Sequence, residues 1–159
     1  MCYKLKLFKL LYFLDFEHFK QTGESVTGLE YFAWPKGPVP KALENEFSDP
    51  QPDILEKVGI EILVENHEVR RVDLTPRVEF DPSFFTEREL SIMRDLAVTY
   101  DLAYSHEMIE ATHVPTQPWH RVYEVEGRRQ EKIPYEYALS EEEAELVEYL
   151  TSEYEGIPI

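Results

Sequence analysis

The sequence predicts an α+β fold, a single mainly helical domain with a small antiparallel sheet. Most of the chain carries apolar residues at helical spacing, and two short β-rich runs are each bounded by turn-forming residues. Strands that alternate with helices, as a parallel sheet requires, are not visible in the pattern. A chain of 159 residues is long enough to bury one core without metals or disulfides. We therefore expect residues 1–159 to form one domain.

The first helix is expected from Tyr3 to Phe19 and is apolar almost all round. Its apolar residues are leucines and aromatics: Leu7, Phe8, Leu10, Leu11, Tyr12, Phe13, Leu14 and Phe16. A helix without a polar face is normally buried at the centre of a domain. Gly23 is well placed to end this helix, because glycine readily adopts the left-handed backbone that terminates helices.

An extended segment follows at Leu29 to Trp34, and a proline-rich loop comes next. The run LEYFAW is aromatic and bounded by turn residues, which favours a buried strand. Pro35, Pro38 and Pro40 each fix one φ angle at roughly −65° and restrict the residue before them. The loop is therefore expected to be rigid without hydrogen bonds of its own.

Two short helices and a hairpin are expected in the middle of the chain. Lys41 to Phe47 and Asp53 to Lys57 have helical patterns, and the run from Ile60 to Leu74 is β-rich on both sides of Asn66. Because asparagine tolerates a positive φ, this run is predicted to be a hairpin. We expect the hairpin to form one small sheet with the extended segment before the prolines and with a third strand at Arg77 to Phe80.

Helix-capping patterns predict two further helices. Thr86 and Glu89 form a capping box, and apolar residues follow at helical spacing: Leu90, Met93, Ala97 and Tyr100. Ser105 is expected to cap a second, shorter helix that extends through Thr112.

The C-terminal segment is predicted to be an acidic helix. Ser140 and Glu143 form another capping box, the helix extends to about Tyr154, and Gly156 and Pro158 close it. The segment contains no lysine or arginine among its many glutamates: Glu136, Glu141, Glu142, Glu143, Glu145, Glu148, Glu153 and Glu155. It is either a solvated helix face or a docking surface for a basic partner, such as an RNA-cutting protein that must itself be cationic to hold its substrate.

The overall charge and the cysteine content narrow the classes of function and location. Sixteen basic and thirty-two acidic side chains give a net charge of −16, which repels a phosphate backbone. We therefore expect no nucleic-acid binding by the chain alone. The single cysteine, Cys2, forms no internal disulfide and fits a reducing compartment. The apolar run from Leu10 to Leu14 is too short for a signal peptide or a membrane span, so we predict an unprocessed cytoplasmic protein.

A metal site is the main chemical alternative that the sequence offers. His106, Glu110 and His113 fall on one face of a predicted helix, and zinc accepts imidazole and carboxylate ligands together. The hydrolase motif needs a second histidine four residues after the first, where this chain has Glu110. No nucleophile elbow or phosphate-binding glycine loop is present. We expect no cofactor, no metal and no enzymatic activity, and we keep a small metal-dependent hydrolase as the rival.

Two features near residue 120 are expected to support the fold. Trp119 is expected to fill the core, and its indole N–H then needs an acceptor. The segment after it holds a local basic cluster: Arg121, Arg128, Arg129 and Lys132. We expect this cluster to be a solvated loop that pairs with the glutamates of the last helix.

The first helix and the proline loop contain the candidate partner-binding residues. These are Asp15, His18, Tyr31, Trp34, Lys36, Gly37 and Pro38. In one interpretation Asp15 accepts hydrogen bonds from backbone amides of the proline loop, and Trp34 belongs to the core. In the other, Trp34 and Lys36 form a binding anchor, because tryptophan dominates interface hot spots and a rigid loop loses little entropy on binding. Each interpretation can hold for different residues.

The stretch from Lys9 to Leu43 resembles the SocA-like antitoxin domain, also called the Panacea domain. The resemblance rests on the helix sequence KLLYF at Lys9 to Phe13, on Thr27-Gly28, and on Gly37-Pro38-Val39. Weaker similarity continues through FDPSFFTEREL, the ATH that ends at His113, the PWHRVYE from Pro118 and the IPYEYAL from Ile133.

The resemblance implies an antitoxin of a type II toxin–antitoxin system. The family is found beside toxin genes in bacteria and phages, so the implied partner is a protein toxin encoded by the neighbouring gene, neutralised by direct binding. One family member is understood to act instead as an adaptor that delivers its toxin to a cytoplasmic protease, so both mechanisms stay open. The family has another helix before the first helix of this chain, and without it the exposed helix surface favours a homodimer or a partner.

Overall fold

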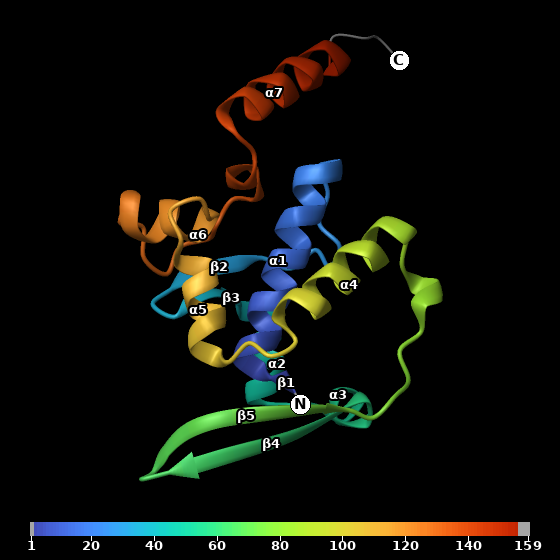
Figure 1. The fold of residues 1–159 in the computed structure, drawn as a ribbon, viewed down its shortest axis with the longest axis vertical. Helices are drawn as coiled ribbons and strands as arrows, with labels where there is room; N and C mark the ends of the chain where they lie inside the picture. The colour runs from blue at the N-terminus through green and yellow to red at the C-terminus, as the bar shows by residue number, and fades with distance from the viewer. Residues whose placement is uncertain (1, 156–159) are drawn as a thin grey trace.

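The fold is arranged around one long central helix, α1 (Lys4–Thr22), in a computed structural model that describes residues 2–155 (Figure 1). This helix contacts several later helices, strands of both sheets and a short C-terminal helical turn. Gly23 ends α1 with a φ of 82°, and its N–H donates to the carbonyl of Phe19 at 2.7 Å. The predicted central position of the first helix and its glycine terminus are therefore confirmed.

The strands of the described residues form two sheets instead of the single predicted one. In the first, β2 (Tyr31–Trp34) pairs antiparallel with β3 (Gly37–Pro40). In the second, the order is β1 (Cys2–Tyr3), β5 (Glu68–Pro76) and β4 (Val58–Glu65). The segment predicted as a proline loop is thus largely a strand. Prolines lack the N–H of an inner ladder, but β3 pairs on one side only, where they are tolerated.

The prediction of a third strand at Arg77 to Phe80 is wrong. The N–H of Arg77 donates to the carbonyl of Lys57, and the chain then leaves the sheet without further strand pairing. The third strand is β1, which pairs with Asp73 and Leu74 of β5. The third strand of this sheet therefore comes from the N-terminal residues and not from the segment after the hairpin.

The hairpin of β4 and β5 and the short helices before it agree with the sequence. Its turn residues Asn66 and His67 have φ angles of 51° and 64°, the positive pair that a two-residue hairpin turn requires. The helices are α2 (Lys41–Ser48) and α3 (Pro52–Lys57). A 3₁₀ turn at Pro82–Phe84 then leads away from the sheet.

Local capping chemistry sets where α4 (Glu87–Tyr100) and α5 (Ser105–His113) begin. The capping box of Thr86 and Glu89 is present at the start of α4. Ser105, however, is the first residue of α5 and not its cap. The N-cap is Tyr104, whose backbone N–H donates to the Glu107 carboxylate at 2.6 Å, so the glutamate fixes the start one residue earlier.

The last helix, α7 (Glu141–Glu155), begins as predicted. The N–H of Glu143 donates to Ser140 Oγ at 3.1 Å, and the N–H of Ser140 donates to the Glu143 carboxylate at 2.7 Å. Figure 1 shows α7 projecting from the rest of the chain. Gly156 and Pro158, expected to close this helix, lie outside the described residues.

The core lies between α1, the β2–β3 hairpin and the C-terminal third of the chain. Its main cluster of buried side chains comprises Tyr12, Phe16, Tyr31, Ala33, Trp119, Val122 and Ile133. Trp119 comes from α6 (Pro118–His120), which leads into a π-helical turn at Arg121–Val125. The segment before the 3₁₀ turn at Tyr135–Ala138 covers the free edge of β2 through three backbone hydrogen bonds of 2.7 to 2.9 Å. None of the helices in residues 2–155 is long and apolar enough to cross a bilayer.

Candidate functional site

The turn between β2 and β3 places two of the predicted binding residues at the surface. Trp34 is 36% exposed, and Lys36 is exposed as well. Trp34 pairs with Gly37 across the hairpin, so the turn is tight. The carbonyl of Trp34 accepts the indole N–H of the buried Trp119 at 2.8 Å, which confirms that Trp119 fills the core and finds an acceptor.

Gly37 supports this turn from below because no other residue fits there. Its φ of 107° lies in a region that favours glycine. A Cβ atom at this position would lie 2.7 Å from Thr112 Oγ1 and 2.9 Å from Lys9 Cε. The hairpin therefore rests directly on side chains of α1 and α5.

An apolar groove of about 360 Å³ opens between the hairpin turn and the first half of α1. We call it the hairpin groove, and its lining residues are Lys4, Leu5, Phe8, Lys9, Trp34, Pro35, Lys36, Val39 and Glu44. The walls are almost entirely apolar, and the polar groups are three lysines and one glutamate. Lys4 and Glu44 form an ion pair with an N–O distance of 3.0 Å at the edge of the groove.

Lys9 is the least exposed of these charged residues. Its side chain is 1% exposed, and its Nζ donates to the carbonyl of Pro38 at 2.8 Å. Burial lowers the pKa of Lys9 to about 7, and the negative charge of Glu44 only partly offsets this effect. The bond to Pro38 ties the lysine to the same hairpin that it supports.

Asp15 fixes the segment that leads into β2. Its fully buried carboxylate accepts hydrogen bonds from the N–H groups of Val26 and Thr27 at 2.9 and 2.8 Å, and from the hydroxyls of Thr27 and Tyr31. Burial, and next the negative charge of Asp15, raise the pKa of Tyr31, so its hydroxyl remains a donor. One interpretation of the sequence had Asp15 accept hydrogen bonds from amides of the proline loop. In the structure its carboxylate oxygens accept hydrogen bonds from the segment before β2 instead. The prolines of that loop have no N–H to offer.

The structure divides the predicted partner-binding residues into a surface pair and a buried support. Trp34 and Lys36 are exposed, whereas the other five are buried: Asp15, His18, Tyr31, Gly37 and Pro38. His18 donates from Nδ1 to the carbonyl of Glu24 at 2.6 Å and so holds the same loop as Asp15. Of these seven residues, only the surface pair is therefore open to solvent, while the buried residues set the position of the turn.

Sequence reasoning missed Lys4, Lys9, Glu44 and Thr112 as parts of the site. A lysine inside an otherwise apolar helix was the available signal for Lys9, because a buried ammonium needs a specific reason to be there. Nothing in the local pattern could have shown that Thr112 touches Gly37, since the contact joins residues far apart in the chain.

The alternative metal site is not assembled. His113 stacks on Trp119 with ring centroids 3.8 Å apart, whereas His106 and Glu110 are exposed to solvent. Burial, and next the positive charge of Lys9, lower the pKa of His113. Residues 2–155 contain no group of three or more histidine, cysteine or acidic side chains that could hold a metal ion.

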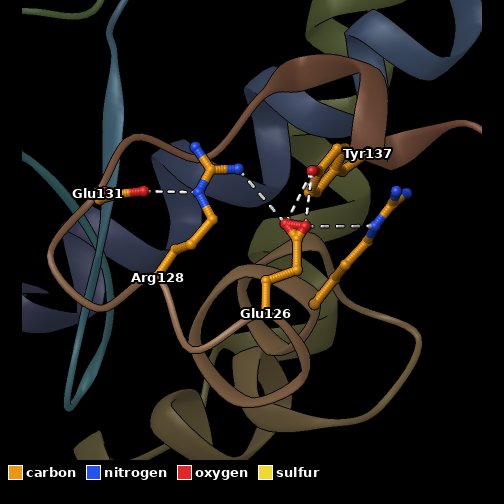
Figure 2. A network of polar contacts seen from close by, with 5 residues as sticks. Glu126, Arg128, Glu131 and Tyr137 are labelled. Carbon is orange, nitrogen blue, oxygen red and sulfur yellow. Dashed lines mark hydrogen bonds and ion pairs between the residues drawn. The ribbon is translucent and has the colours of Figure 1, made fainter.

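The basic cluster after Trp119 was expected to pair with the glutamates of α7. It pairs instead with acidic residues close to it in the chain and with Glu30. Figure 2 shows Glu126 between Arg128 and Tyr137, and the Tyr137 hydroxyl donates to this carboxylate at 2.8 Å. Arg128 also pairs with Glu131, and Lys132 pairs with Glu30 at 3.0 Å. The prediction failed because α7 projects away, which leaves its glutamates out of reach. Several apolar residues of α7 are also exposed: Leu146, Val147, Tyr149 and Leu150.

Comparisons with known proteins give one match. A family model described as "Antitoxin SocA-like, Panacea domain" matches residues 7–120, well over half of the chain. No curated protein and no solved structure matches. The matched segment extends from the first turn of α1 to the end of α6, so it contains most of the hairpin groove and leaves α7 outside.

Proposed function

The chain belongs to the family of SocA-like antitoxins with a Panacea domain, and from this premise we propose its function. On that premise, it is the antitoxin of a type II toxin–antitoxin pair. It neutralises the protein toxin encoded by the neighbouring gene through direct protein–protein binding. The hairpin groove is the surface that makes this contact.

The observation that carries the proposal is an exposed tryptophan on a turn that packs against side chains of α1 and α5. Trp34 lies beside the groove, and its own carbonyl is bonded to the buried Trp119. Tryptophan side chains dominate interface hot spots, and a turn that is already ordered loses little entropy on binding. These two properties support the hairpin turn as an anchor.

The charge of the chain supports a basic partner. A net charge of −16 attracts a cationic protein over long distance and raises the rate of encounter. Toxins that act on RNA need cationic surfaces to hold their substrate. Long-range attraction brings the two proteins together, and the groove then supplies the specific contact.

The test is to co-express the chain with the product of the neighbouring gene and to score growth and co-purification. Wild type should restore growth and co-purify with the toxin, whereas Trp34→Ala and Lys36→Glu should lose both while their melting temperatures stay close to wild type. Lys20→Glu is the matched control, because Lys20 is an exposed lysine near the opposite end of α1. Rescue of growth by both groove variants would place toxin binding elsewhere.

The same cells distinguish direct binding from delivery to a protease. A pulse-chase experiment measures the lifetime of the toxin with and without the antitoxin. Direct binding predicts that the toxin persists in a complex. A toxin that disappears only when a cytoplasmic protease is present would show that the chain is an adaptor instead.

A further inference from the structure

The hairpin groove has a local charge opposite to that of the whole chain. It brings together Lys4, Lys9 and Lys36, although acidic residues outnumber basic ones by two to one in the sequence. Glu44, the one acidic residue of its lining, is already paired with Lys4. Among the described residues, neither Lys9 nor Lys36 forms an ion pair. The groove is therefore a cationic site on an acidic protein.

The ammonium group of Lys9 has donors left over. It carries three N–H groups, and a single bond, to the carbonyl of Pro38, is formed among the described residues. Its side chain is 1% exposed, so water cannot easily satisfy the others. A buried ammonium with unmet donors costs stability. Lys9 lines the groove, so a carboxylate seated there would accept one of these donors.

The walls of the groove determine what must accompany that anion. Leu5 and Phe8 lie on one side, and Pro35 and Val39 on the other. A volume of about 360 Å³ is at the small end of the range for ligand pockets and suits one or two side chains. A bare inorganic anion would leave these apolar walls in contact with water. An apolar side chain next to a carboxylate would match both the walls and the lysines.

We propose that the hairpin groove binds an acidic side chain of the toxin, an aspartate or glutamate flanked by an apolar residue, whose carboxylate pairs with Lys9 and Lys36. This inference rests on the proposed function, because it assumes that the partner is the toxin. A second copy of this chain is a poor occupant, since two chains of charge −16 repel each other. The opposite net charges of the chain and a basic toxin bring the two proteins together. The contact between the carboxylate and the lysines of the groove then gives the binding its specificity.

The first measurement is the affinity for the purified toxin by calorimetry. Lys36→Met should weaken binding about tenfold and Lys36→Glu about a hundredfold, since each step removes or reverses one charge contact. Lys9→Met should weaken binding at least as much as Lys36→Met, because the buried lysine is desolvated. Lys20→Met and Lys20→Glu are the matched controls and should bind within about twofold of wild type.

The second measurement is a charge exchange. Each aspartate and glutamate on the surface of the toxin is changed singly to lysine and tested for binding to Lys36→Glu. One such toxin variant should bind Lys36→Glu at least tenfold more tightly than the wild-type toxin does. The same variant should bind the wild-type antitoxin more weakly than the wild-type toxin does. Since Lys36 is exposed, its variants fold even where Lys9→Met does not.

The outcomes separate this inference from the function on which it rests. If the wild-type chain does not bind the neighbouring gene product, the proposed function fails. If it binds, but Lys36→Met and Lys9→Met bind equally well and no toxin variant rescues Lys36→Glu, the carboxylate contact alone is overturned. Sedimentation that shows a dimer dissociated by Lys36→Glu, with toxin binding unchanged, would identify a second copy as the occupant and also overturn it.

Discussion

The two hairpins of this protein differ in what holds them in place. The β2–β3 hairpin is short, and its ends and turn rest on buried groups from distant parts of the chain, among them Lys9 and Asp15. The β4–β5 hairpin is longer, and its outer half is held by its own ladder and turn. Large apolar side chains there are more than half exposed, including Ile62, Val64 and Val69.

This difference determines which of the two hairpin turns has a fixed position relative to α1. A hairpin fixed by its own ladder can bend as a unit, because few outside contacts resist the motion. A hairpin fixed from several helices keeps its turn in one position relative to α1. Only the second arrangement presents Trp34 and Lys36 in a fixed geometry beside the groove. The strongest test of this contrast is to remove the outside contacts one at a time.

The largest effect should follow Asp15→Ala. The change leaves the hydroxyl of the buried Tyr31 and the N–H groups of Val26 and Thr27 without their acceptor, which should lower the free energy of unfolding by on the order of 3–5 kcal/mol. Urea denaturation measures it. Asp81→Ala is the matched control, because Asp81 also accepts from a backbone N–H and a hydroxyl, both of Ser83, but at an exposed site. A loss below about 1 kcal/mol for Asp15→Ala would show that the loop does not depend on this carboxylate.

Gly37→Ala should come next, with a loss of about 2–4 kcal/mol in the free energy of unfolding. The added Cβ meets Thr112 Oγ1 and Lys9 Cε at under 3 Å, and the φ of 107° adds backbone strain. Gly127→Ala separates the two causes, because Gly127 has a φ of 64° but no atom within 4 Å of the added Cβ. Equal losses for the two alanine variants would mean that the contact with α1 and α5 contributes nothing.

A third effect concerns pH and Lys9. The folded-state pKa of Lys9 is about 7, against an ordinary value of 10.5, so the unfolded chain binds more protons between these values. Stability should therefore rise with pH in this window, by roughly 2 kcal/mol from pH 7 to 9. Glu44 and His113 are the other titratable groups whose charges act on Lys9 or respond to it. Urea denaturation of Lys9→Met at both pH values should lack this rise, and a parallel rise in the variant would assign it to another group.

The smallest effect is expected in the long hairpin. Ile62→Thr and Val64→Thr change side chains that are 57% and 55% exposed, so the free energy of unfolding should change by less than about 0.5 kcal/mol. Neutralisation of the toxin should also be unchanged, as measured by growth on co-expression. If either variant abolishes neutralisation while folding normally, this hairpin is covered by a partner and the contrast between the two hairpins is lost.

Local signals predicted the helices better than they predicted the sheets. The capping boxes at Thr86 and Ser140 and the glycine after α1 act within a few residues, so the sequence near them carries the information. Strand pairing joins distant segments, and no local pattern indicates that Cys2 pairs with Leu74. The strand from Gly37 to Pro40 was missed because its prolines argue against a central strand, although they are compatible with an edge.

The candidate site was predictable in its surface pair and in part of its buried support, such as Asp15 and Gly37, but not in Lys9 or Thr112. A rigid proline loop was expected to present Lys36, whereas the sequence left open whether Trp34 is exposed or belongs to the core. The position of Lys9 beneath that turn depends on the absence of a side chain at Gly37 and on Thr112, which approaches from another helix. Such a three-part contact has no periodicity, so only the folded chain reveals it.

The segment that covers the edge of β2 has a consequence for exchanging parts between relatives. The family match ends at residue 120, yet Ile133 is 1% exposed and donates its N–H to Tyr31 in β2. A chimera joined at residue 120 would remove this core residue and uncover a strand edge, which invites aggregation. A junction after Leu139 would keep the edge covered and exchange α7 alone. The transplantable unit of this protein is therefore longer than the part that defines its family.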